Sequence, residues 1–189
     1  MKYCSQCGAK VTLEIPEGDN RPRHVCSRCR YIHYQNPNIV AGCIPFWEDQ
    51  VLLCRRAIEP KHGLWTLPAG FMENDETAIE AAVRETAEEA GARVLEPKLH
   101  TIISLPHVNQ VYMMYRAQLA DLKFAPGEES LETALYKQQH IPWGEMAFAV
   151  IEHTLRFYFQ DLGRDKYDIY HGDLRRIQEN PAKYELTLF

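Results

Sequence analysis

The sequence concentrates its acidic residues in one short segment. Seven acids and a single base, Arg84, stand between positions 73 and 89. The acids are Glu73, Asp75, Glu76, Glu80, Glu85, Glu88 and Glu89. The whole chain carries a net charge of −5 and this segment alone −6, so the other residues sum to +1. Such a balance argues against a protein that binds polyanions without regard to sequence, and it points to one local site.

The acidic segment is predicted to be a helix from about Asn74 to Ala90. Asn74 or Asp75 can cap its start, alanine is frequent along it, and Gly91 follows it as the C′ residue. One side of this helix carries the carboxylates of Glu85, Glu88 and Glu89. Another side gathers Ile79, Val83, Thr86 and Ala90 and is expected to face the core.

The three clustered carboxylates indicate a cation site. Like charges three and four residues apart weaken a helix unless a cation offsets them. Oxygen ligands of this kind suit Mg²⁺ or Mn²⁺ better than zinc. A solvated acidic face remains the alternative interpretation, because most charge runs are of that kind.

Two Cys-x-x-Cys pairs, Cys4 with Cys7 and Cys26 with Cys29, are separated by 18 residues. This spacing predicts a tetrahedral four-thiolate zinc site, with a redox or disulfide role as the alternative. Four protein ligands make such a site structural, and metal binding then replaces the hydrophobic core that residues 1–33 lack. Two histidines flank the second pair and are expected at the surface or in packing: His24 and His33.

The remaining composition describes a globular intracellular protein. Apolar residues make up 46% of the chain and charged residues 25%, which excludes collagen-like and wholly disordered classes. No apolar run approaches the roughly 18 residues of a membrane helix, and the first residues do not resemble a signal peptide. We therefore expect a cytoplasmic protein without a membrane partner, with Cys43 and Cys54 as small buried core residues.

The order of the predicted elements suggests four segments: a zinc ribbon at 1–33, a linker at 34–38, a main domain at 39–160 and an extension at 161–189. Strands are predicted at 39–46, 51–55, 99–104, 111–120 and 135–138, and a second helix at 143–160. The last segment is polar and is expected to be either a docked extension or a mobile tail.

A longer pattern surrounds the acidic helix. It consists of Gly70, five residues, Glu76, seven residues and then Arg84-Glu85-Thr86-Ala87-Glu88-Glu89-Ala90-Gly91-Ala92. This pattern resembles the Nudix box at every polar and glycine position. Thr86 and Ala92 stand where larger apolar residues are usual. With the four-cysteine ribbon and the segments 31–37 and 64–73, the chain resembles the zinc-ribbon branch of Nudix hydrolases over about residues 1–160.

The resemblance implies a fold and a chemistry. The fold is α/β, a Nudix-type α/β/α sandwich with a mixed sheet, preceded by a small zinc ribbon. Nudix enzymes hydrolyse a nucleoside diphosphate linked to a moiety X by metal-assisted attack of water on phosphorus. Carried onto this chain, the resemblance assigns Mg²⁺ or Mn²⁺ ligands to Glu85 and Glu89, a further ligand or water activator to Glu88, and a backbone ligand to the Ala69 carbonyl.

Roles for neighbouring residues also follow from the resemblance. Arg84 is expected to pair with Glu80 or Glu88, while Glu76 orients the loop and points away from the Glu85 cluster. A later catalytic carboxylate is assigned to Glu132, with Glu128 and Glu129 as rivals. Arg55 and Arg56 are candidates to bind phosphate, or else are solvated. Three aromatic residues are candidates to stack on a base ring, or else are core residues: Phe46, Trp47 and Tyr112.

The motif set is most similar to bacterial relatives of the plant plastid enzyme that hydrolyses FAD and ADP-ribose. We therefore expect FAD or ADP-ribose as substrate, with AMP as a product, a homodimer, and no nucleic-acid partner. NADH pyrophosphatases, which also act on NAD-capped RNA, are a second possibility. They carry a Ser-Gln-Pro-Trp-Pro-Phe-Pro-like segment, whereas Ser104–Gln110 lacks the aromatic run. A non-catalytic sensor of ADP-ribose or nucleic acid is a third.

Overall fold

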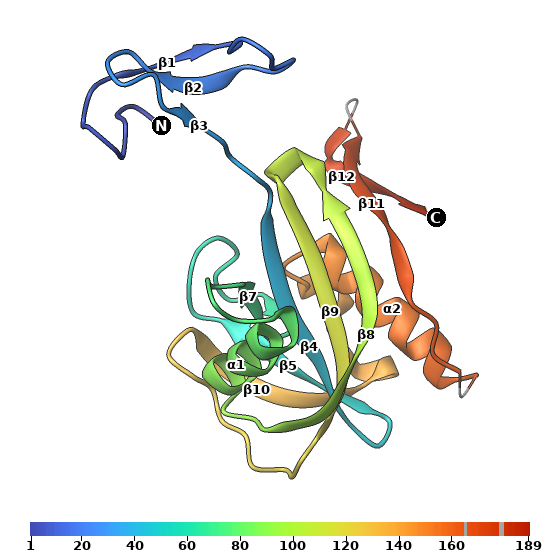
Figure 1. The fold of residues 1–189 in the computed structure, drawn as a ribbon. Helices are drawn as coiled ribbons and strands as arrows, with labels where there is room; N and C mark the ends of the chain where they lie inside the picture. The colour runs from blue at the N-terminus through green and yellow to red at the C-terminus, as the bar shows by residue number, and fades with distance from the viewer. Residues whose placement is uncertain (165, 178–179) are drawn as a thin grey trace. The chain divides into compact units, whose positions relative to one another are not determined.

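The structure, a computed structural model, describes residues 1–164, 166–177 and 180–189. Its chain forms two compact units, Met1–Pro37 and Asn38–Phe189 (Figure 1). The division falls inside the predicted linker at 34–38. Among the described residues, no helix has both the length and the apolar character needed to cross a bilayer.

The first unit is a small antiparallel sheet of three strands in the order β1-β2-β3. Its strands are β1 (Val11–Glu14), β2 (Arg23–Cys26) and β3 (Ile32–His33). The interior consists of little more than Val25 and the buried cysteines Cys4 and Cys26. So small an apolar interior cannot stabilise a fold of this length without a crosslink or a metal.

The second unit is built on one mixed sheet whose main path is β10-β5-β4-β9-β8-β11-β12. Its strands are β4 (Asn38–Trp47), β5 (Gln50–Arg56), β6 (Trp65–Thr66), β7 (Ala69–Phe71), β8 (Val94–Leu105), β9 (Gln110–Leu119), β10 (Ser130–Lys137), β11 (Tyr170–Ile177) and β12 (Asn180–Leu188). Strands β4 and β9 run parallel, as do β8 and β11, while the other pairs are antiparallel. The predicted mixed sheet is confirmed.

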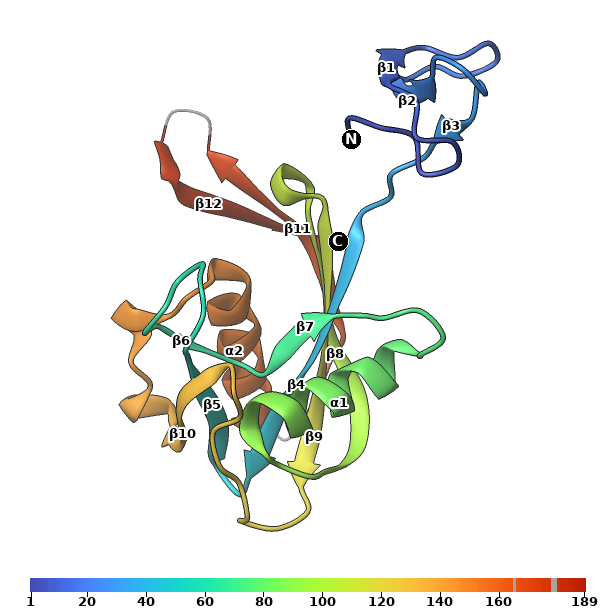
Figure 2. The same ribbon diagram turned by 90° about the vertical axis from the view of Figure 1, so that its left-hand side faces the viewer.

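Two helices pack on opposite faces of this sheet, α1 (Ala78–Ala90) and α2 (Ala149–Leu162) (Figure 2). Alternate side chains of a strand point to opposite faces, and β4 serves both helices in this way. Its residues Val40 and Ile44 join the core beneath α2, whereas Ala41 and Cys43 join the core beneath α1. The α/β/α layering expected from the sequence is thus present.

Helix α1 begins later than predicted. Its N-cap is Thr77, whose hydroxyl accepts a hydrogen bond from the Glu80 amide at 3.2 Å, while the Thr77 amide donates to the Glu80 carboxylate at 2.7 Å. This reciprocal capping box satisfies two amides that would otherwise lack partners. The expectation of a cap at Asn74 or Asp75 is wrong, because Asp75 has a left-handed φ of 67° within the preceding loop.

Small residues explain how α1 lies so close to the sheet. Thr86 is fully buried and its hydroxyl donates to the Ala82 carbonyl at 2.7 Å, which satisfies it internally. Ala92 is 1% exposed and packs in a third cluster with Leu119. The two positions where the box usually has larger residues are therefore filled by close packing. The predicted C′ residue Gly91 is confirmed, with a left-handed φ of 57°.

Other elements also begin at residues different from those predicted. Strand β8 begins five residues before the predicted start, and β10 begins at Ser130 rather than at residue 135. The second helix begins at Ala149, because Trp143–Glu145 forms a separate 3₁₀ turn after Pro142. Cys43 and Cys54 are buried as expected, and burial raises the pKa of the Cys43 thiol to about 11.

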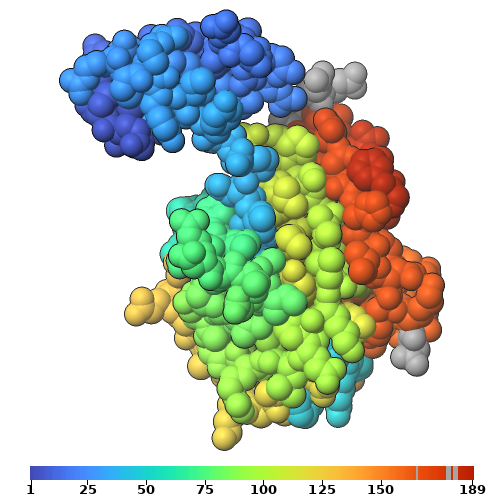
Figure 3. All heavy atoms as spheres, viewed as in Figure 1, coloured from blue at the N-terminus to red at the C-terminus, as the bar shows by residue number. Residues whose placement is uncertain are grey.

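The C-terminal residues form part of the sheet. Strand β11 pairs in parallel with β8, and β12 pairs antiparallel with β11. Figure 3 shows these strands, in red, lying against the yellow-green residues of β8. Leu174 of β11 is 1% exposed and belongs to the main core beneath α2. Of the two expectations for residues 161–189, the pairing of the described strands β11 and β12 agrees with a docked extension.

Candidate active site

Two carboxylates of the acidic helix α1, Glu85 and Glu89, lie against strand β7. The side chain of Glu89 is buried, and its Oε2 accepts a hydrogen bond from the Ala69 amide at 3.3 Å. Glu85 lies against Gly70, where a β-carbon added to the glycine would stand only 2.3 Å from Glu85 Oε1. A side chain at position 70 would therefore displace the Glu85 carboxylate, which gives a reason for the glycine that opens the sequence pattern.

Arg84 links the acids of the site. Its Nη1 donates to Glu85 at 2.7 Å and to Glu88 at 2.9 Å, and its Nη2 donates to Glu76 at 2.8 Å. The expected pairing with Glu88 is present, whereas Glu80 instead completes the helix cap. Glu76 also accepts a hydrogen bond from the Glu73 amide at 2.7 Å, as expected of a residue that orients the loop, and although it shares Arg84 with Glu85 it does not line the cleft. Glu76 precedes the helix in the loop, so helical spacing does not govern its direction.

Burial disfavours the charged forms of two of these carboxylates. Burial, followed by the charge of Glu85, raises the pKa of Glu89 to about 8. Burial also raises the pKa of Glu85, although Arg84 opposes the shift. A divalent cation would restore the charged forms, and an all-oxygen donor set fits Mg²⁺ or Mn²⁺. Among the described residues, the four cysteines form the one group of three or more potential metal ligands found close together, and these carboxylates line an open cleft.

The loop before β10 is tied to the end of α1. Gly127 donates from its amide to the Glu89 carbonyl at 3.0 Å, and a side chain at Gly127 would collide with the Glu88 carbonyl. The Glu129 carbonyl accepts from the Ala57 amide at 2.8 Å. These contacts bring Glu128 and Glu129 into the lining of the cleft. The charge of Glu129 contributes to raising the pKa of both Glu85 and Glu89.

Glu132, the later carboxylate favoured by the resemblance, lies elsewhere. It is part of β10, opposite Arg55 of β5, and the two side chains are 3.8 Å apart with both about half exposed. Neither side chain lines the cleft. Because β10 begins at Ser130, residue 132 is already held in the sheet, whereas the preceding loop reaches the helix. The structure thus places Glu129, and not Glu132, in the lining of the cleft, while the catalytic role of either residue stays a prediction.

The two arginines at the end of β5 separate, as neighbours in a strand do. Arg56 lines the cleft, with its guanidinium 5.2 Å from the centroid of the Phe148 ring and its Nε donating to the Pro60 carbonyl at 2.9 Å. Arg55 donates to the Gly63 carbonyl at 2.9 Å, away from the carboxylates. Of this pair only Arg56 lines the cleft, and phosphate binding by either arginine stays a prediction.

The cleft has a volume of about 1280 Å³. Of the three aromatic candidates, Tyr112 lines it, whereas Phe46 and Trp47 pack against core clusters. Aromatic and basic residues that the sequence analysis missed also line it: Phe71, His107, Phe148, Arg176 and Tyr184. Most of these come from outside the box, and no spacing in the sequence connects them with it.

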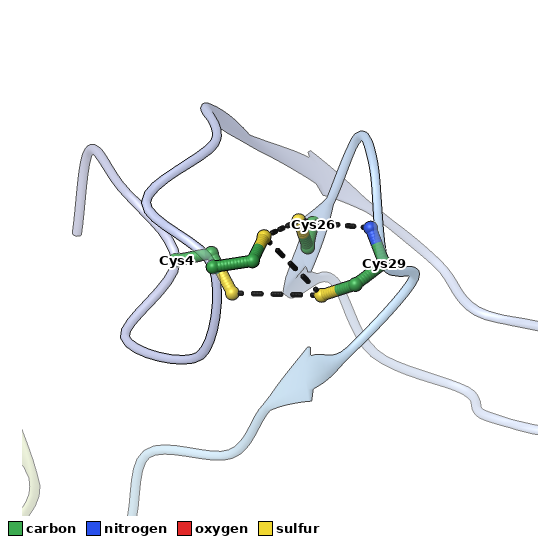
Figure 4. A group of neighbouring side chains, drawn as sticks. Cys4, Cys26 and Cys29 are labelled. Atoms are coloured by element: carbon green, nitrogen blue, oxygen red, sulfur yellow. Dashed lines mark hydrogen bonds between the residues drawn. The ribbon is translucent and has the colours of Figure 1, made fainter.

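The four cysteines of the first unit converge on one point (Figure 4). Their Sγ atoms lie 3.7 Å apart for Cys4 and Cys29, 3.4 Å for Cys7 and Cys26, and 3.5 Å for Cys7 and Cys29. A tetrahedron with Zn–S bonds of about 2.3 Å has edges of about 3.8 Å. All four cysteines are free of disulfides, so the arrangement fits one tetrahedral zinc ion.

Backbone amides donate hydrogen bonds to cysteine sulfur atoms and so stabilise the thiolate form that binds metal. The amides of Arg28 and Cys29 donate to Cys26 Sγ at 3.4 and 3.3 Å. A backbone hydrogen bond from Ala9 is the main cause that lowers the pKa of Cys7 to about 6. Stabilised thiolates bind metal more tightly because fewer protons must be displaced. The two flanking histidines, His24 and His33, lie outside the cluster, as predicted.

Comparisons with known proteins agree with this architecture. A family model described as "Nudix N-terminal" matches residues 2–35, and one described as "NUDIX domain" matches residues 36–138. The chain is 28% identical over 162 residues to the NAD-capped RNA hydrolase NudC of Photobacterium profundum, covering 81% of this chain and 58% of that protein. For the protein of the same name from Klebsiella pneumoniae subsp. pneumoniae, identity is 29%, covering 82% and 60%. The chain thus spans about three fifths of the length of these curated relatives.

Solved structures show the same fold. The crystal structure of a NUDIX hydrolase from Nitrosomonas europaea has a TM-score of 0.90 and 54% identity, covering 93% of this chain and 99% of that one. An ADP-ribose pyrophosphatase from Streptococcus suis 89-1591, at 20% identity and a TM-score of 0.60, shares the fold, covering 72% of this chain and 99% of that one. The family models, the ribbon cysteines and the carboxylate helix together show that the chain belongs to the Nudix hydrolases, a family of pyrophosphohydrolases, in the branch that carries an N-terminal zinc ribbon.

Proposed function

We propose that this protein hydrolyses the pyrophosphate bond of FAD or ADP-ribose in the presence of Mg²⁺ and releases AMP. The observation that carries the proposal is the meeting of α1 and the loop before β10 at one cleft. Together with Arg56, the cleft is lined by the carboxylates that these two segments contribute, which are Glu85, Glu88 and Glu89 from α1 and Glu128 and Glu129 from the loop. Carboxylates can bind a divalent metal ion, and an arginine beside them can bind the phosphates of the substrate. This combination suits metal-assisted hydrolysis of a pyrophosphate.

The proposed roles follow from position. Glu85 and Glu89, with Glu88 and the Ala69 carbonyl, would hold Mg²⁺ or Mn²⁺. Such an ion, when bound, supplies positive charge against the pyrophosphate and makes nearby water more acidic. Arg84 keeps Glu85 and Glu88 in fixed orientations through its hydrogen bonds.

The proposed reaction balances with one water molecule. The water oxygen forms a bond to one phosphorus, the bridging P–O bond breaks, and the bridging oxygen leaves with the other phosphate. The proton of the water passes to a cleft carboxylate, for which Glu129 and Glu88 are the candidates, and Glu129 takes the place that the sequence assigned to Glu132. Arg56 faces the phosphates and offsets their charge.

The size of the cleft favours a dinucleotide or an ADP-sugar. Small-molecule pockets commonly have volumes of about 300–1000 Å³, and this cleft has about 1280 Å³. The names of the curated relatives support NAD-capped RNA as the second candidate substrate, and NADH stays an alternative from the sequence resemblance. The expectation of no nucleic-acid partner, the homodimer, the cytoplasmic location and the binding-only sensor all stay predictions.

A hydrolysis screen with Mg²⁺ tests these alternatives. FAD, ADP-ribose, NADH, nucleoside triphosphates and NAD-capped RNA are each incubated with the protein, and AMP or the decapped RNA is measured. Glu89→Gln should lower turnover by orders of magnitude, because it removes a buried anionic ligand. Glu132→Gln, on the surface of β10, is the matched control and should retain turnover. Unchanged turnover in Glu89→Gln would refute the assignment, and binding without turnover of any substrate would favour the sensor.

A further inference from the structure

The end of the cleft beside the C-terminal hairpin includes residues that lie beyond the family-model match at 36–138. In the hairpin, Arg176 of β11 lies opposite Tyr184 of β12, and Leu174 lies opposite Leu186. Leu174 is buried in the core, and side chains two residues apart share one face of a strand. Arg176 therefore continues the core-facing side of β11 to the cleft, where Leu174, Arg176 and Tyr184 all line the wall.

Three side chains meet at this end. The Tyr184 ring lies 5.5 Å from the His107 ring, measured between centroids, with an angle of 49° between their planes. The guanidinium carbon of Arg176 lies 5.8 Å from the centroid of the Tyr184 ring. His107 belongs to the 3₁₀ turn η1 (Pro106–Val108) between β8 and β9, and Figure 2 shows the hairpin beside that turn. Burial and the charge of Arg176 lower the pKa of His107.

These groups differ in chemistry from the carboxylate end. Two ring surfaces and one cation suit a flat heteroaromatic ring, which stacks on Tyr and is attracted by Arg. The carboxylates lie elsewhere in the same cleft, where the pyrophosphate belongs in the proposed function. We propose that Tyr184, His107 and Arg176 form a ring-binding subsite that holds a heteroaromatic ring of the substrate and sets its specificity. This inference rests on the proposed function and deepens it.

The competing explanation is that the cluster only holds the hairpin against η1. In that case, substitutions would lower thermal stability without altering the affinity for one substrate relative to another. A subsite would instead raise KM while kcat changes little, because stacking contributes equally to the ground and transition states. The division between KM and kcat therefore separates the two explanations.

The test uses the full chain with Mg²⁺ and four variants: Tyr184→Ala, Tyr184→Phe, Arg176→Gln and Arg175→Gln. We expect Tyr184→Ala to raise KM by about 5- to 150-fold, the range for loss of one stacked base. Tyr184→Phe should restore a KM close to that of the unmodified protein, because it keeps the ring. Arg176→Gln should also raise KM. Arg175 lies on the other face of β11 and is hydrogen-bonded to Asp173, so Arg175→Gln is the matched control.

Comparing substrates identifies the ring. FAD and NADH carry an adenine and a second ring, whereas ADP-ribose carries adenine alone. If the subsite holds adenine, Tyr184→Ala raises KM for all three. If it holds the second ring, KM rises for FAD and NADH while ADP-ribose is spared. Either pattern supports the subsite.

The proposal is overturned if Tyr184→Ala and Arg176→Gln each leave KM within about twofold for every substrate while circular dichroism shows a folded protein. If the unmodified protein hydrolyses none of these substrates, the proposed function is refuted, but the subsite is not yet tested. Calorimetric titration with FAD, AMP and ADP-ribose then still decides the subsite. Loss of affinity in Tyr184→Ala that Tyr184→Phe restores supports it, and equal affinities refute it.

Discussion

Arg84 Nη1 lies 2.7 Å from Glu85 Oε1, although the two residues are neighbours in the sequence. Consecutive side chains of a helix point about 100° apart, so the contact depends on the length of the arginine side chain. The same nitrogen also donates to Glu88, one turn further on. Arg84 therefore acts as a clamp that fixes the directions of two proposed metal ligands.

Removing this clamp should weaken catalysis. Arg84→Gln should lower activity by about 10- to 100-fold, the usual range for losing a group that orients metal ligands. The measurement is kcat together with the Mg²⁺ concentration that gives half-maximal rate. Arg93→Gln, which breaks an exposed pair with Asp121, is the control and should behave like the unmodified protein. Full activity in Arg84→Gln would show that the carboxylates need no clamp.

A methyl group at position 70 should also disturb the Glu85 carboxylate, because Gly70 of β7 lies against it. In Gly70→Ala the new β-carbon would meet the end of the Glu85 side chain, which can move at small cost in folding free energy. We therefore expect Tm to change little while activity falls at least about tenfold. Gly144→Ala adds a methyl group where no atom lies within 4 Å, and it should alter neither quantity. A large fall in Tm without loss of specific activity would contradict this account.

The identity of the later carboxylate can be decided by a pair of substitutions. Glu129→Gln should lower kcat by about 10²- to 10⁴-fold if this residue takes the proton of water, the range for general base catalysis. Glu132→Gln should lower kcat by less than about threefold, because Glu132 contacts only Arg55 among the described ion pairs. The opposite ranking would restore Glu132 as the catalytic residue.

The buried histidine of β8 should make stability depend on pH. His100 is fully buried, and burial lowers its pKa to about 4, with Asp161 and Arg116 as charged neighbours acting in opposite directions. In the unfolded chain His100 takes up a proton below its ordinary pKa of about 6.5, whereas the folded form resists until about pH 4. This residue therefore destabilises the fold by up to about 3 kcal/mol as pH falls through that interval.

Urea denaturation at pH 7, 5.5 and 4 tests this prediction. Between pH 7 and pH 4, the free energy of unfolding of His100→Phe should fall by about 3 kcal/mol less than that of the unmodified protein. The exposed residue His140 provides the control substitution His140→Phe, which should keep the full decrease. Equal pH dependence in all three proteins would rule out His100 as the cause.

Metal content tests the ribbon. Elemental analysis of the purified chain should give one zinc per molecule, because the four thiols already lie near tetrahedral distances. Replacing Cys26 and Cys29 by Ser should abolish zinc binding and loosen residues 1–37, since little apolar core remains to hold them. His24→Asn should retain the zinc. A folded first unit without zinc, seen by NMR, would contradict the prediction.

Local patterns explain which features were predictable. Helix α1, its C′ residue Gly91 and the packing of Cys43 follow from residue spacing and periodicity, which act over a few residues. The zinc ligands also follow from spacing, because two Cys-x-x-Cys turns need little else to converge. The start of α1 was missed because Thr77 and Glu80 competed with Asp75 for the cap, and only the backbone at Asp75 decided between them.

The sequence by itself determined the family, the carboxylate helix and the four thiols, since each depends on residues that are close in the chain. Tertiary structure alone decided that Glu129 rather than Glu132 reaches the cleft, because the register between β10 and β5 fixes where the loop ends. It also brought Arg176 and Tyr184 to the cleft through a hairpin that pairs with β8, about 70 residues earlier. Such pairings depend on hydrogen bonds between distant strands, and no local preference of the residues encodes them.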